Sequence, residues 1–324
     1  MKKIALVLSF VFVLTYPLWA RPRVEEAKAP IPLVINAIKG PSGVGMIGLF
    51  ENPPQIPGYE VSVEAFGQAD IIAAKFISGE AKIGILPPNV AAKIASSGKN
   101  VQIAAIVGAG MISLITGDPS IQSIGDIKGK TVEAAGQGAT PEYVFRHILK
   151  ARGIDPDKDL KLTFTLAYPE IAQSLIAGRL SLALLVEPFV TMALRENPAL
   201  RQVGDIQEEW VKAGGNSNYP MTALVVDGDF ARENKNAVGI ILRDYKISTE
   251  WVLSHPAEAG QLVEKFELGL RAPVVQAVVP RSNYVFLSAR EARPAIESLF
   301  SVFLENNPAS IGGKLPESGF YYQE

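Results

Sequence analysis

Two glycine-containing loops stand where backbone amide groups can hold a small molecule. Each loop follows an apolar run of strand length and precedes a helical pattern; they cover residues 40–46 and 136–141. Glycine lets the backbone approach a ligand closely, and free amides at the start of a helix donate hydrogen bonds to it. The candidate contact residues in these loops are Gly40, Ser42, Gly43, Met46, Gly136, Gln137, Gly138, Ala139 and Thr140. The chemistry they predict is reversible binding.

Both loops also have a purely structural interpretation. The first can be a tight strand-to-helix turn. In the second, Thr140 suits an N-cap and Pro141 the first helical position, so part of the pattern is helix initiation. Two glycines just before the cap exceed what capping requires.

A second group of candidates lies at strand ends and helix starts. Glu187 follows the buried-looking strand 182–186, where a carboxylate is unfavourable unless it is solvated, paired or bound to something. Asp70, Pro88 and Asn89 open the second and third predicted helices. Capping is the alternative role for Asp70 and Asn89.

Aromatic side chains near the same loops can stack on a ligand ring. Tyr143 is one turn into the helix after the second loop, and Tyr168 and Phe189 follow strands of the second half of the chain. Packing in the core is the alternative for all three. Weaker candidates, for the hinge side, are Trp210, Asn218 and Tyr219.

Strands alternate with helices along most of the chain, which predicts βαβ units and a mostly parallel sheet. The first series has strands at 33–38, 59–65, 82–86 and 101–107 and helices at 44–51, 70–78 and 89–97. The second has strands at 131–135, 160–166 and 182–186 and helices at 141–152, 170–177 and 188–196. A last strand at 221–226 precedes helices at 237–255, 257–266 and 289–306. We therefore expect an α/β protein.

The two series predict two related lobes. Residues 76–87 and 175–186 share a local pattern, and the final helices bring few strands of their own, so they are expected to return to the first lobe. The predicted boundaries are a signal peptide at 1–20, lobe one at 31–117 plus 222–324, and lobe two at 118–221. Crossings near 116–118 and 219–221 would form a hinge, with few contacts elsewhere between the lobes.

The first twenty residues predict export. They combine Lys2 and Lys3, an apolar run at 4–14 and a small residue, Ala20, before Arg21, which is typical of a cleaved signal peptide. A membrane anchor is the alternative, but a span needs about 18 or more consecutive apolar residues. The chain has no cysteine, which excludes lipid anchoring, disulfides and thiolate metal sites. The expected location is the periplasm, without a lipid anchor.

Charge and composition narrow the class of protein. The formal net charge is −2, and loss of residues 1–20 removes two lysines and no acid, giving −4. A mildly acidic chain without runs of like charge is a poor match for nucleic acid. A hydrophobic content of 48% over 324 residues supports a large core, usually divided into two domains.

Motifs for catalysis and cofactor binding are missing. His147 falls inside a predicted helix and His255 closes another, so neither of the two histidines follows a strand. The sequence contains no HExxH, GxSxG or Walker pattern and no complete GxGxxG fingerprint. We therefore expect no enzymatic activity, no cofactor and no metal ion.

Several motifs, in order along the chain, resemble one family of binding proteins. They are GPSG at 40–43, SGEA at 78–81, LPPN at 86–89, IGDIKGKT at 124–131, GQGATPEY at 136–143, EPF at 187–189 and IGGKLP at 311–316. Together they resemble the nitrate, sulfonate and taurine type of periplasmic binding protein, which includes binders of thiamine-pyrimidine precursors. The resemblance implies a type II periplasmic-binding-protein fold with the ligand between two lobes. Open α/β sheets place ligands at the same edge, beyond the carboxyl ends of their strands.

The resemblance also implies a partner and a role. The chain would be the solute-binding component of an ABC importer, a monomer that binds one small molecule and delivers it to an ABC permease in the inner membrane. A free-standing periplasmic sensor and a thiamine-pyrimidine-synthase-like enzyme are the alternatives of another class. Absence of cysteine disfavours the enzyme.

The candidate residues favour one kind of ligand. Asp70 and Glu187 would repel a free sulfonate or nitrate and accept hydrogen bonds from amino or ring N–H groups. Helix starts favour an anion, but the loops contain no arginine and Lys39 is their only lysine. We therefore expect a planar, amine-bearing heterocycle such as a thiamine-pyrimidine or another vitamin precursor. The alternative is an aliphatic sulfonate, taurine or a nitrate-type anion.

Overall fold

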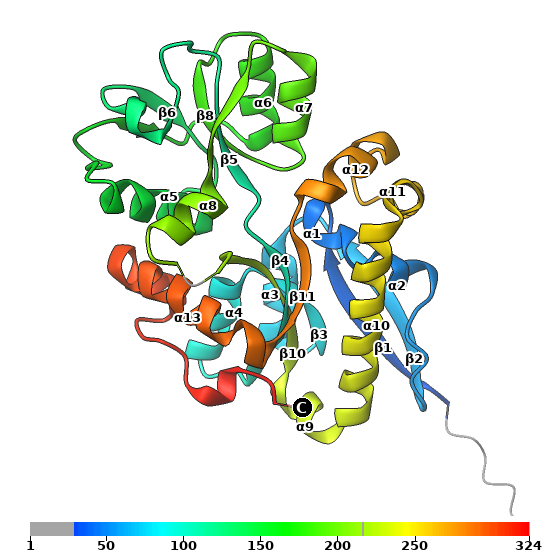
Figure 1. The fold of residues 1–324 in the computed structure, drawn as a ribbon. Helices are drawn as coiled ribbons and strands as arrows, with labels where there is room; N and C mark the ends of the chain where they lie inside the picture. Colours follow the sequence, from blue (N-terminus) through cyan, green and yellow to red (C-terminus); the bar gives the residue numbers. More distant parts are fainter. Residues whose placement is uncertain (1–28, 216, 324) are drawn as a thin grey trace, which may run out of the picture.

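The chain is built around two separate sheets, each with its own helices (Figure 1). The computed structural model describes residues 29–215 and 217–323. The predicted signal peptide at 1–20 and its cleavage site lie outside these residues. We call the elements around the first sheet lobe one and those around the second lobe two.

The central strands of the lobe-one sheet are buried on both faces. Its strand order is β11-β4-β10-β3-β1-β2. The strands are β1 (Ile31–Ile38), β2 (Tyr59–Phe66), β3 (Ile83–Leu86), β4 (Val101–Ala109), β10 (Pro220–Asp227) and β11 (Tyr284–Ser288). Along β10, Ala223 and Val225 join one core cluster and Leu224 and Val226 the other, because successive side chains point to opposite faces. Burial on both faces explains why β3, β4 and β10 are mostly apolar, whereas the edge strand β2 alternates between exposed and half-buried residues.

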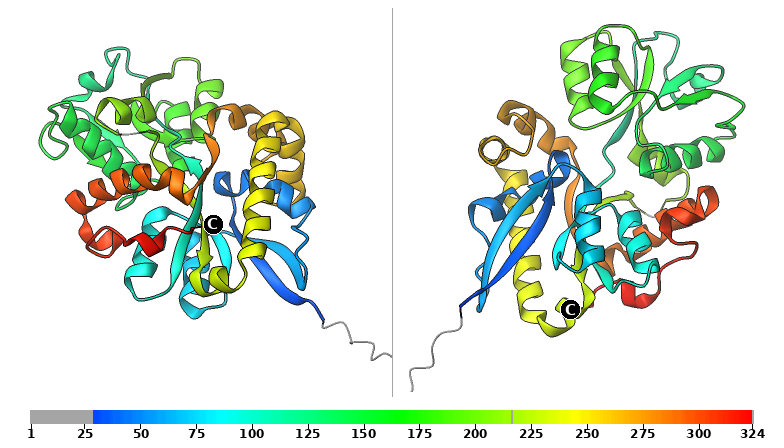
Figure 2. Two further views of the ribbon diagram at one scale, coloured as in Figure 1. Left: turned by 60° about the horizontal axis from the view of Figure 1, so that its bottom comes forward. Right: turned by 180° about the vertical axis from the view of Figure 1, so that it is seen from behind.

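Helices cover both faces of this sheet. Elements that contribute to one core cluster are α3 (Ala69–Ser78), α4 (Pro88–Ser96) and α13 (Ala289–Asn306). Elements that contribute to the other are α2 (Ile47–Glu51), α9 (Gly228–Glu233) and α10 (Lys235–Ser254). The remaining elements of lobe one are α1 (Pro41–Val44), α11 (Pro256–Lys265), α12 (Ala272–Val278), η2 (Val279–Arg281), η3 (Pro308–Ile311) and η4 (Ser318–Phe320). The late helices α10 to α13 thus return to lobe one, and Figure 2 shows this from two further sides.

Lobe two has a smaller sheet with the order β7-β6-β8-β5-β9. Its strands are β5 (Ile112–Thr116), β6 (Thr131–Glu133), β7 (Lys161–Thr163), β8 (Leu182–Val186) and β9 (Arg201–Asp205). Its helices are η1 (Ile124–Ile127), α5 (Thr140–Ala151), α6 (Tyr168–Ile176), α7 (Phe189–Glu196) and α8 (Ile206–Lys212). The predicted α/β class is therefore confirmed for both halves of the chain.

The prediction of mostly parallel sheets is wrong. Pairing is parallel among β1, β2 and β3 and among β6, β7 and β8. The pairs that involve β10, β11 or β5 are antiparallel. β5 and β10 are the strands by which the chain enters each sheet from the other lobe, so they run against their neighbours.

The predicted helix at 44–51 is two short helices, α1 and α2. The break lies at Gly45, whose carbonyl oxygen accepts hydrogen bonds from Ser248 Oγ at 3.0 Å and Thr249 Oγ1 at 3.3 Å. These hydroxyls lie on α10, about 200 residues further along the chain. The sequence pattern around Gly45 does not contain this information.

The first crossing between lobes lies earlier than predicted. Because β5 pairs with β8 and β9, it belongs to lobe two, and the chain changes sheet at residues 110–111 rather than near 116–118. The boundary expected at 117 and 118 is corrected accordingly. β4 and β5 form one nearly continuous apolar run, so the break is not visible as a change of pattern. The return crossing follows α8 and enters β10 at Pro220.

Gly110 ties the two crossings together. The Gly110 amide donates to the carbonyl oxygen of Tyr219 at 2.9 Å and to Asn218 Oδ1 at 3.1 Å. In return, Asn218 Nδ2 donates to the carbonyl oxygen of Gly110 at 3.3 Å. Asn283, just before β11, also donates to that carbonyl oxygen. A third segment therefore takes part in the junction.

Gly110→Ala is expected to destabilise the protein by about 1–3 kcal/mol, since a methyl group here overpacks the junction. A Cβ at this position would overlap the ring of Tyr219 and lie 2.7 Å from Asn218 Oδ1. Urea denaturation measures the effect, with Gly67→Ala as control because a Cβ at Gly67 meets no atom within 4 Å. Equal unfolding midpoints for the two variants would contradict a tightly packed junction.

Candidate ligand-binding site

Only some of the predicted contact residues in the first glycine loop are accessible to a ligand. Gly40 is the N-cap of α1, and a Cβ there would meet open space. Ser42 is half-buried, and its hydroxyl has no partner among the residues described. Gly43 is buried, and a Cβ there would lie 2.5 Å from both the Ile38 carbonyl oxygen and Leu268, so packing explains this glycine. Met46 is fully buried in the core of lobe one.

The second glycine loop is closed by a carboxylate of the helix that follows it. Gln137 and Gly138 are exposed, and the amide of Gly138 donates to Glu142 Oε2 at 2.7 Å. The predicted cap at Thr140 is wrong by one position, since Ala139 is the N-cap and makes no side-chain hydrogen bond. Thr140 is the buried first residue of α5, and the carboxylate of Glu142, rather than a side chain at the N-cap, accepts the hydrogen bond from the Gly138 amide.

All three long helices that start near the strand ends of lobe two hold a carboxylate of their own. At α6, Glu170 Oε2 accepts from the amide of Ala167 at 3.0 Å. At α7, Glu187 Oε2 accepts from the amide of Thr191 at 3.1 Å, and Oε1 from the Thr191 hydroxyl at 3.0 Å. Together with Glu142 at α5, these contacts neutralise the helix ends that would otherwise attract an anion.

Glu187 is also the residue through which the lobes meet electrostatically. Its Oε1 lies 3.3 Å from Nε of Arg281, at the end of η2 in lobe one. Arg281 Nη2 also donates to Gln202 Oε1 of β9 at 3.0 Å. Among the residues that the structure describes, this is the only ion pair between the lobes.

Burial dominates the titration of Glu187. Its side chain is 3% exposed, and desolvation raises its pKa; the hydrogen bonds from Thr191 and the charge of Arg281 offset this only in part. Sequence reasoning found the carboxylate but missed Arg281, because the arginine follows a helix of lobe one and belongs to neither glycine loop. An arginine does therefore stand at the predicted site.

Tyr168 and Phe189 form a stacked pair beside the second loop. Their ring centroids are 6.2 Å apart with an interplanar angle of 15°. Tyr168 donates to the carbonyl oxygen of Ala135 at 3.3 Å, and burial raises its pKa. Its hydroxyl lies 3.7 Å from the position of a Cβ on Gly136, so the loop and the pair form one surface. Both rings are half-buried, which leaves area for contact with a ligand.

Tyr143 makes a contact between the lobes. It is buried, its hydroxyl accepts from Asn307 Nδ2 at 3.1 Å, and its ring meets Phe303 edge-on at a centroid distance of 5.1 Å. The prediction of few contacts away from the crossings is therefore wrong: α5 packs on α13, and Glu187 pairs with Arg281. Trp210 and Tyr219 are core residues in edge-to-face contact at 5.8 Å, and Asn218 bonds to Gly110.

A groove of about 590 Å³ opens between α5 and the C-terminal end of α13. It is lined by Gln137, Gly138, Glu142, Tyr143, Arg146, Lys150, Asp157, Glu305, Asn306 and Asn307. Three predicted site residues, from the second loop and α5, thus border a groove shared by both lobes.

Capping does not explain Asp70 or Asn89. Gln68 and Pro87 are the N-caps of α3 and α4, and neither makes a side-chain hydrogen bond. Asp70 is exposed and Asn89 half-buried, and within the described parts of the chain neither side chain has a hydrogen bond or ion pair. Both remain available as ligand contacts, whereas Pro88 is buried.

The histidines take structural positions. His147 lies in α5 with its ring 5.3 Å from that of Trp210, and His255 is the C-cap of α10, stacked on Trp251 at 5.5 Å. No group of three or more His, Asp or Glu side chains within 29–215 and 217–323 is arranged to hold a metal ion.

Comparison with known proteins places the chain in a family. Residues 58–259, more than half of the chain, match the family described as NMT1/THI5 like. The chain belongs to the NMT1/THI5-like family. Among curated proteins, the putative binding protein YtlA of Bacillus subtilis is 26% identical over 133 residues, which is 41% of this chain and 37% of YtlA.

Solved structures share the fold of this NMT1/THI5-like chain. An ABC transporter protein from Parabacteroides distasonis matches with a TM-score of 0.76 and 24% identity, over 90% of this chain and 99% of that one. The periplasmic aliphatic sulphonate binding protein SsuA from Escherichia coli matches with a TM-score of 0.71 and 17% identity, over 91% of this chain and 93% of SsuA. The periplasmic nitrate-binding protein NrtA from Synechocystis matches with a TM-score of 0.59 and 11% identity, over 87% of this chain and 84% of NrtA. The predicted periplasmic-binding-protein fold is confirmed.

Within residues 29–215 and 217–323 of this family member, the helices are too short or too polar to span a bilayer.

Proposed function

We propose that this protein is the solute-binding component of an ABC importer and holds one small molecule between its lobes. Family membership, the shared fold and the paired crossings at Gly110 and Pro220 support the proposal. With the corrected boundary, lobe one comprises residues 31–110 and 220–323, and lobe two 111–219. An ABC permease is the proposed partner.

We further propose that the ligand is planar and neutral or amine-bearing, of the thiamine-pyrimidine type. The observation that carries this step is the self-neutralised set of helix ends in lobe two, at Glu142, Glu170 and Glu187. An added anion would meet these carboxylates instead of free amides, whereas amino and ring N–H groups can donate to them. The Tyr168–Phe189 pair offers a face for a flat ring.

A sulfonate or nitrate-type anion is the second candidate, and Arg281 favours it. Its guanidinium reaches the predicted site, and a planar oxyanion binds such a fork well. In this structure Arg281 is already engaged by Glu187 and Gln202. An anion would have to displace a buried carboxylate from it, which makes this candidate less favourable.

Calorimetric titration of the purified protein tests the ligand class. The panel is aminopyrimidines, flavins, aliphatic sulfonates, taurine and nitrate. We expect saturable one-to-one binding of an aminopyrimidine or a similar amine-bearing ring. Tight binding of a sulfonate or nitrate that persists in Glu187→Gln would exclude the carboxylate argument and favour the second candidate.

Export is a separate proposal. Cleavage between Ala20 and Arg21 is expected to release a protein without lipid into the periplasm. Mass spectrometry of protein recovered from a periplasmic extract checks this prediction. A mass that still includes residues 1–20 would contradict it.

A further inference from the structure

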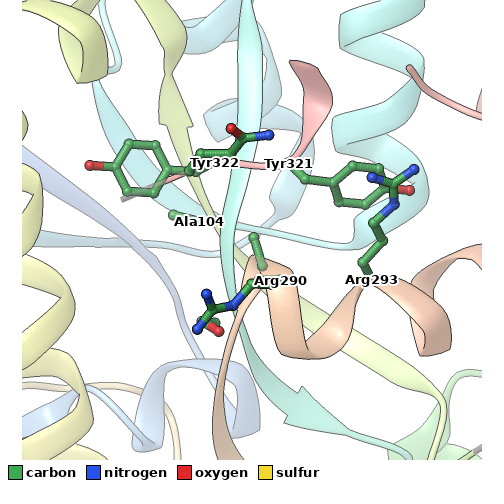
Figure 3. A pocket seen from close by; sticks show the side chains of 8 residues that line it. Ala104, Arg290, Arg293, Tyr321 and Tyr322 are labelled. Atoms are coloured by element: carbon green, nitrogen blue, oxygen red, sulfur yellow. The ribbon is translucent and has the colours of Figure 1, made fainter. Parts of the chain in front are cut away.

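A second pocket, of about 340 Å³, lies on lobe one between β4, the start of α13 and the C-terminal segment (Figure 3). It is lined by Ala104, Ser288, Ala289, Arg290, Arg293, Tyr321, Tyr322 and Gln323. Ala104 lies five residues before the end of β4, where the chain crosses to lobe two. At about 3.3 Å per residue, the pocket is roughly 17 Å from that crossing. It is therefore separate from the site between the lobes.

The lining of this pocket is cationic. Among residues 29–215 and 217–323, those that line it include two arginines and no carboxylate. Arg293 pairs with Glu297 at 2.8 Å, and its guanidinium lies 4.8 Å from the ring centroid of Tyr321. Arg290 is exposed and makes no hydrogen bond or ion pair with a described residue. One complete guanidinium fork is thus available at the pocket.

The place of these arginines on α13 is electrostatically unfavourable when the pocket is empty. Both lie in the first two turns of an 18-residue helix, where the helix dipole favours negative charge. Glu291 compensates in part, but its Oε2 is directed to Ser288, accepting from the amide at 2.9 Å and the hydroxyl at 2.7 Å. A bound anion would complement the Arg290 guanidinium and the helix end, whereas Arg293 already has Glu297 as its partner.

The aromatic wall adds a flat surface. The hydroxyl of Tyr321 is buried beside the carboxylate of Glu297, the residue that also pairs with Arg293, so this end of the wall is occupied by the chain itself. In Figure 3 its ring lies against Arg293, while Arg290 extends separately from the same helix. A free arginine and a defined volume therefore occur together at the start of α13.

We propose that this pocket binds a small oxyanion, a carboxylate or a phosphate group, with Arg290 as the principal contact. The site is independent of the ligand between the lobes, so it stands whether or not the proposed importer function holds. A bidentate guanidinium contact is the geometry that both kinds of oxyanion prefer.

Titration with inorganic phosphate and, separately, with citrate tests the proposal, with ionic strength held constant by chloride. The variant is Arg290→Gln. Its matched control is Arg195→Gln, which removes another exposed arginine without a hydrogen bond or ion pair in the described chain, at the end of α7 in lobe two. Arg290→Lys keeps the charge and removes the fork.

Saturable binding of one anion is expected in the wild type and in Arg195→Gln. Arg290→Gln should weaken it about tenfold or more, and Arg290→Lys should recover part of the loss. A response to phosphate alone assigns the pocket to phosphate groups, and a response to citrate alone assigns it to carboxylates. The absence of saturation, or equal affinity in wild type and Arg290→Gln, would overturn the proposal. Any effect of the anions would then be general screening of the protein's charges.

Discussion

Glu187→Gln is expected to weaken ligand binding about tenfold or more without lowering stability at neutral pH. A hydrogen bond to a charged acceptor contributes about 1.5–3 kcal/mol, and glutamine removes that charge from the ligand. Stability should not fall, because loss of one acceptor oxygen towards Thr191 is offset by removal of a buried group whose ionised form is disfavoured and whose pKa is raised. Calorimetry and urea denaturation on the same preparation measure both effects.

The pH dependence of stability has a defined sign for this residue. A folded pKa above the unfolded value gives a contribution that is fully present below the unfolded pKa and lost as pH rises through the folded pKa. The wild type should therefore gain stability relative to Glu187→Gln as pH falls from neutral through the raised pKa. Denaturation curves at a series of pH values follow this difference.

Glu133→Gln is the matched control, with the opposite sign. Glu133 is 4% exposed, but burial, which raises its pKa, is outweighed by hydrogen bonds from Thr163, Thr165 and Leu166, so the pKa is lowered. Its contribution is present above the unfolded pKa and lost as pH falls through the folded pKa. This variant should lose stability at neutral pH and keep its ligand. Equal behaviour of the two variants would remove the evidence for a functional role of Glu187.

Gly138→Val is expected to reduce ligand affinity about tenfold or more, because a branched side chain separates the loop backbone from the ligand. Gly138 has φ +73°, and valine is strained there by roughly 1–2 kcal/mol or more. The variant should therefore also be less stable, so loss of binding alone does not show that the loop contacts the ligand. Thermal unfolding and calorimetry are measured together.

Gly178→Val separates the two effects. Gly178 has φ +69°, a Cβ added there would meet no atom within 4 Å, and it lies just beyond the C-terminal end of α6. The same backbone strain should give a similar loss of stability but unchanged affinity. If Gly178→Val weakened binding as much as Gly138→Val, the second loop would be a structural turn only.

The sequence was sufficient for the elements whose pattern is local. The limits of β8 and of α13 coincide with the predicted ranges 182–186 and 289–306, since each is a run with clear ends. Glu187 was found because an acid after a buried strand is unusual. Tyr168 and Phe189 were found because both follow strands of the same sheet, and they do stack.

Contacts between distant segments were not predictable in the same way. Arg281 meets Glu187 only because η2 of lobe one lies beside α7 of lobe two in the folded chain. The sequence around Arg281 contains no motif that would indicate this. Tyr143 resembled a ligand contact, but α13, more than 140 residues later, covers it. Met46 is likewise the last residue of the first glycine loop, and it is buried in the core cluster that includes α10. Tertiary packing decided all three.

The carboxylates at the starts of α5, α6 and α7 have a consequence for the empty protein. Helix ends without such groups attract ions from the buffer, and a ligand must then release a counterion before it can bind. Here Glu142, Glu170 and Glu187 fill that role from within the chain. We therefore expect the kind of salt anion present to have little influence on binding of the proposed ligand, because these three helix ends already hold carboxylates of the chain.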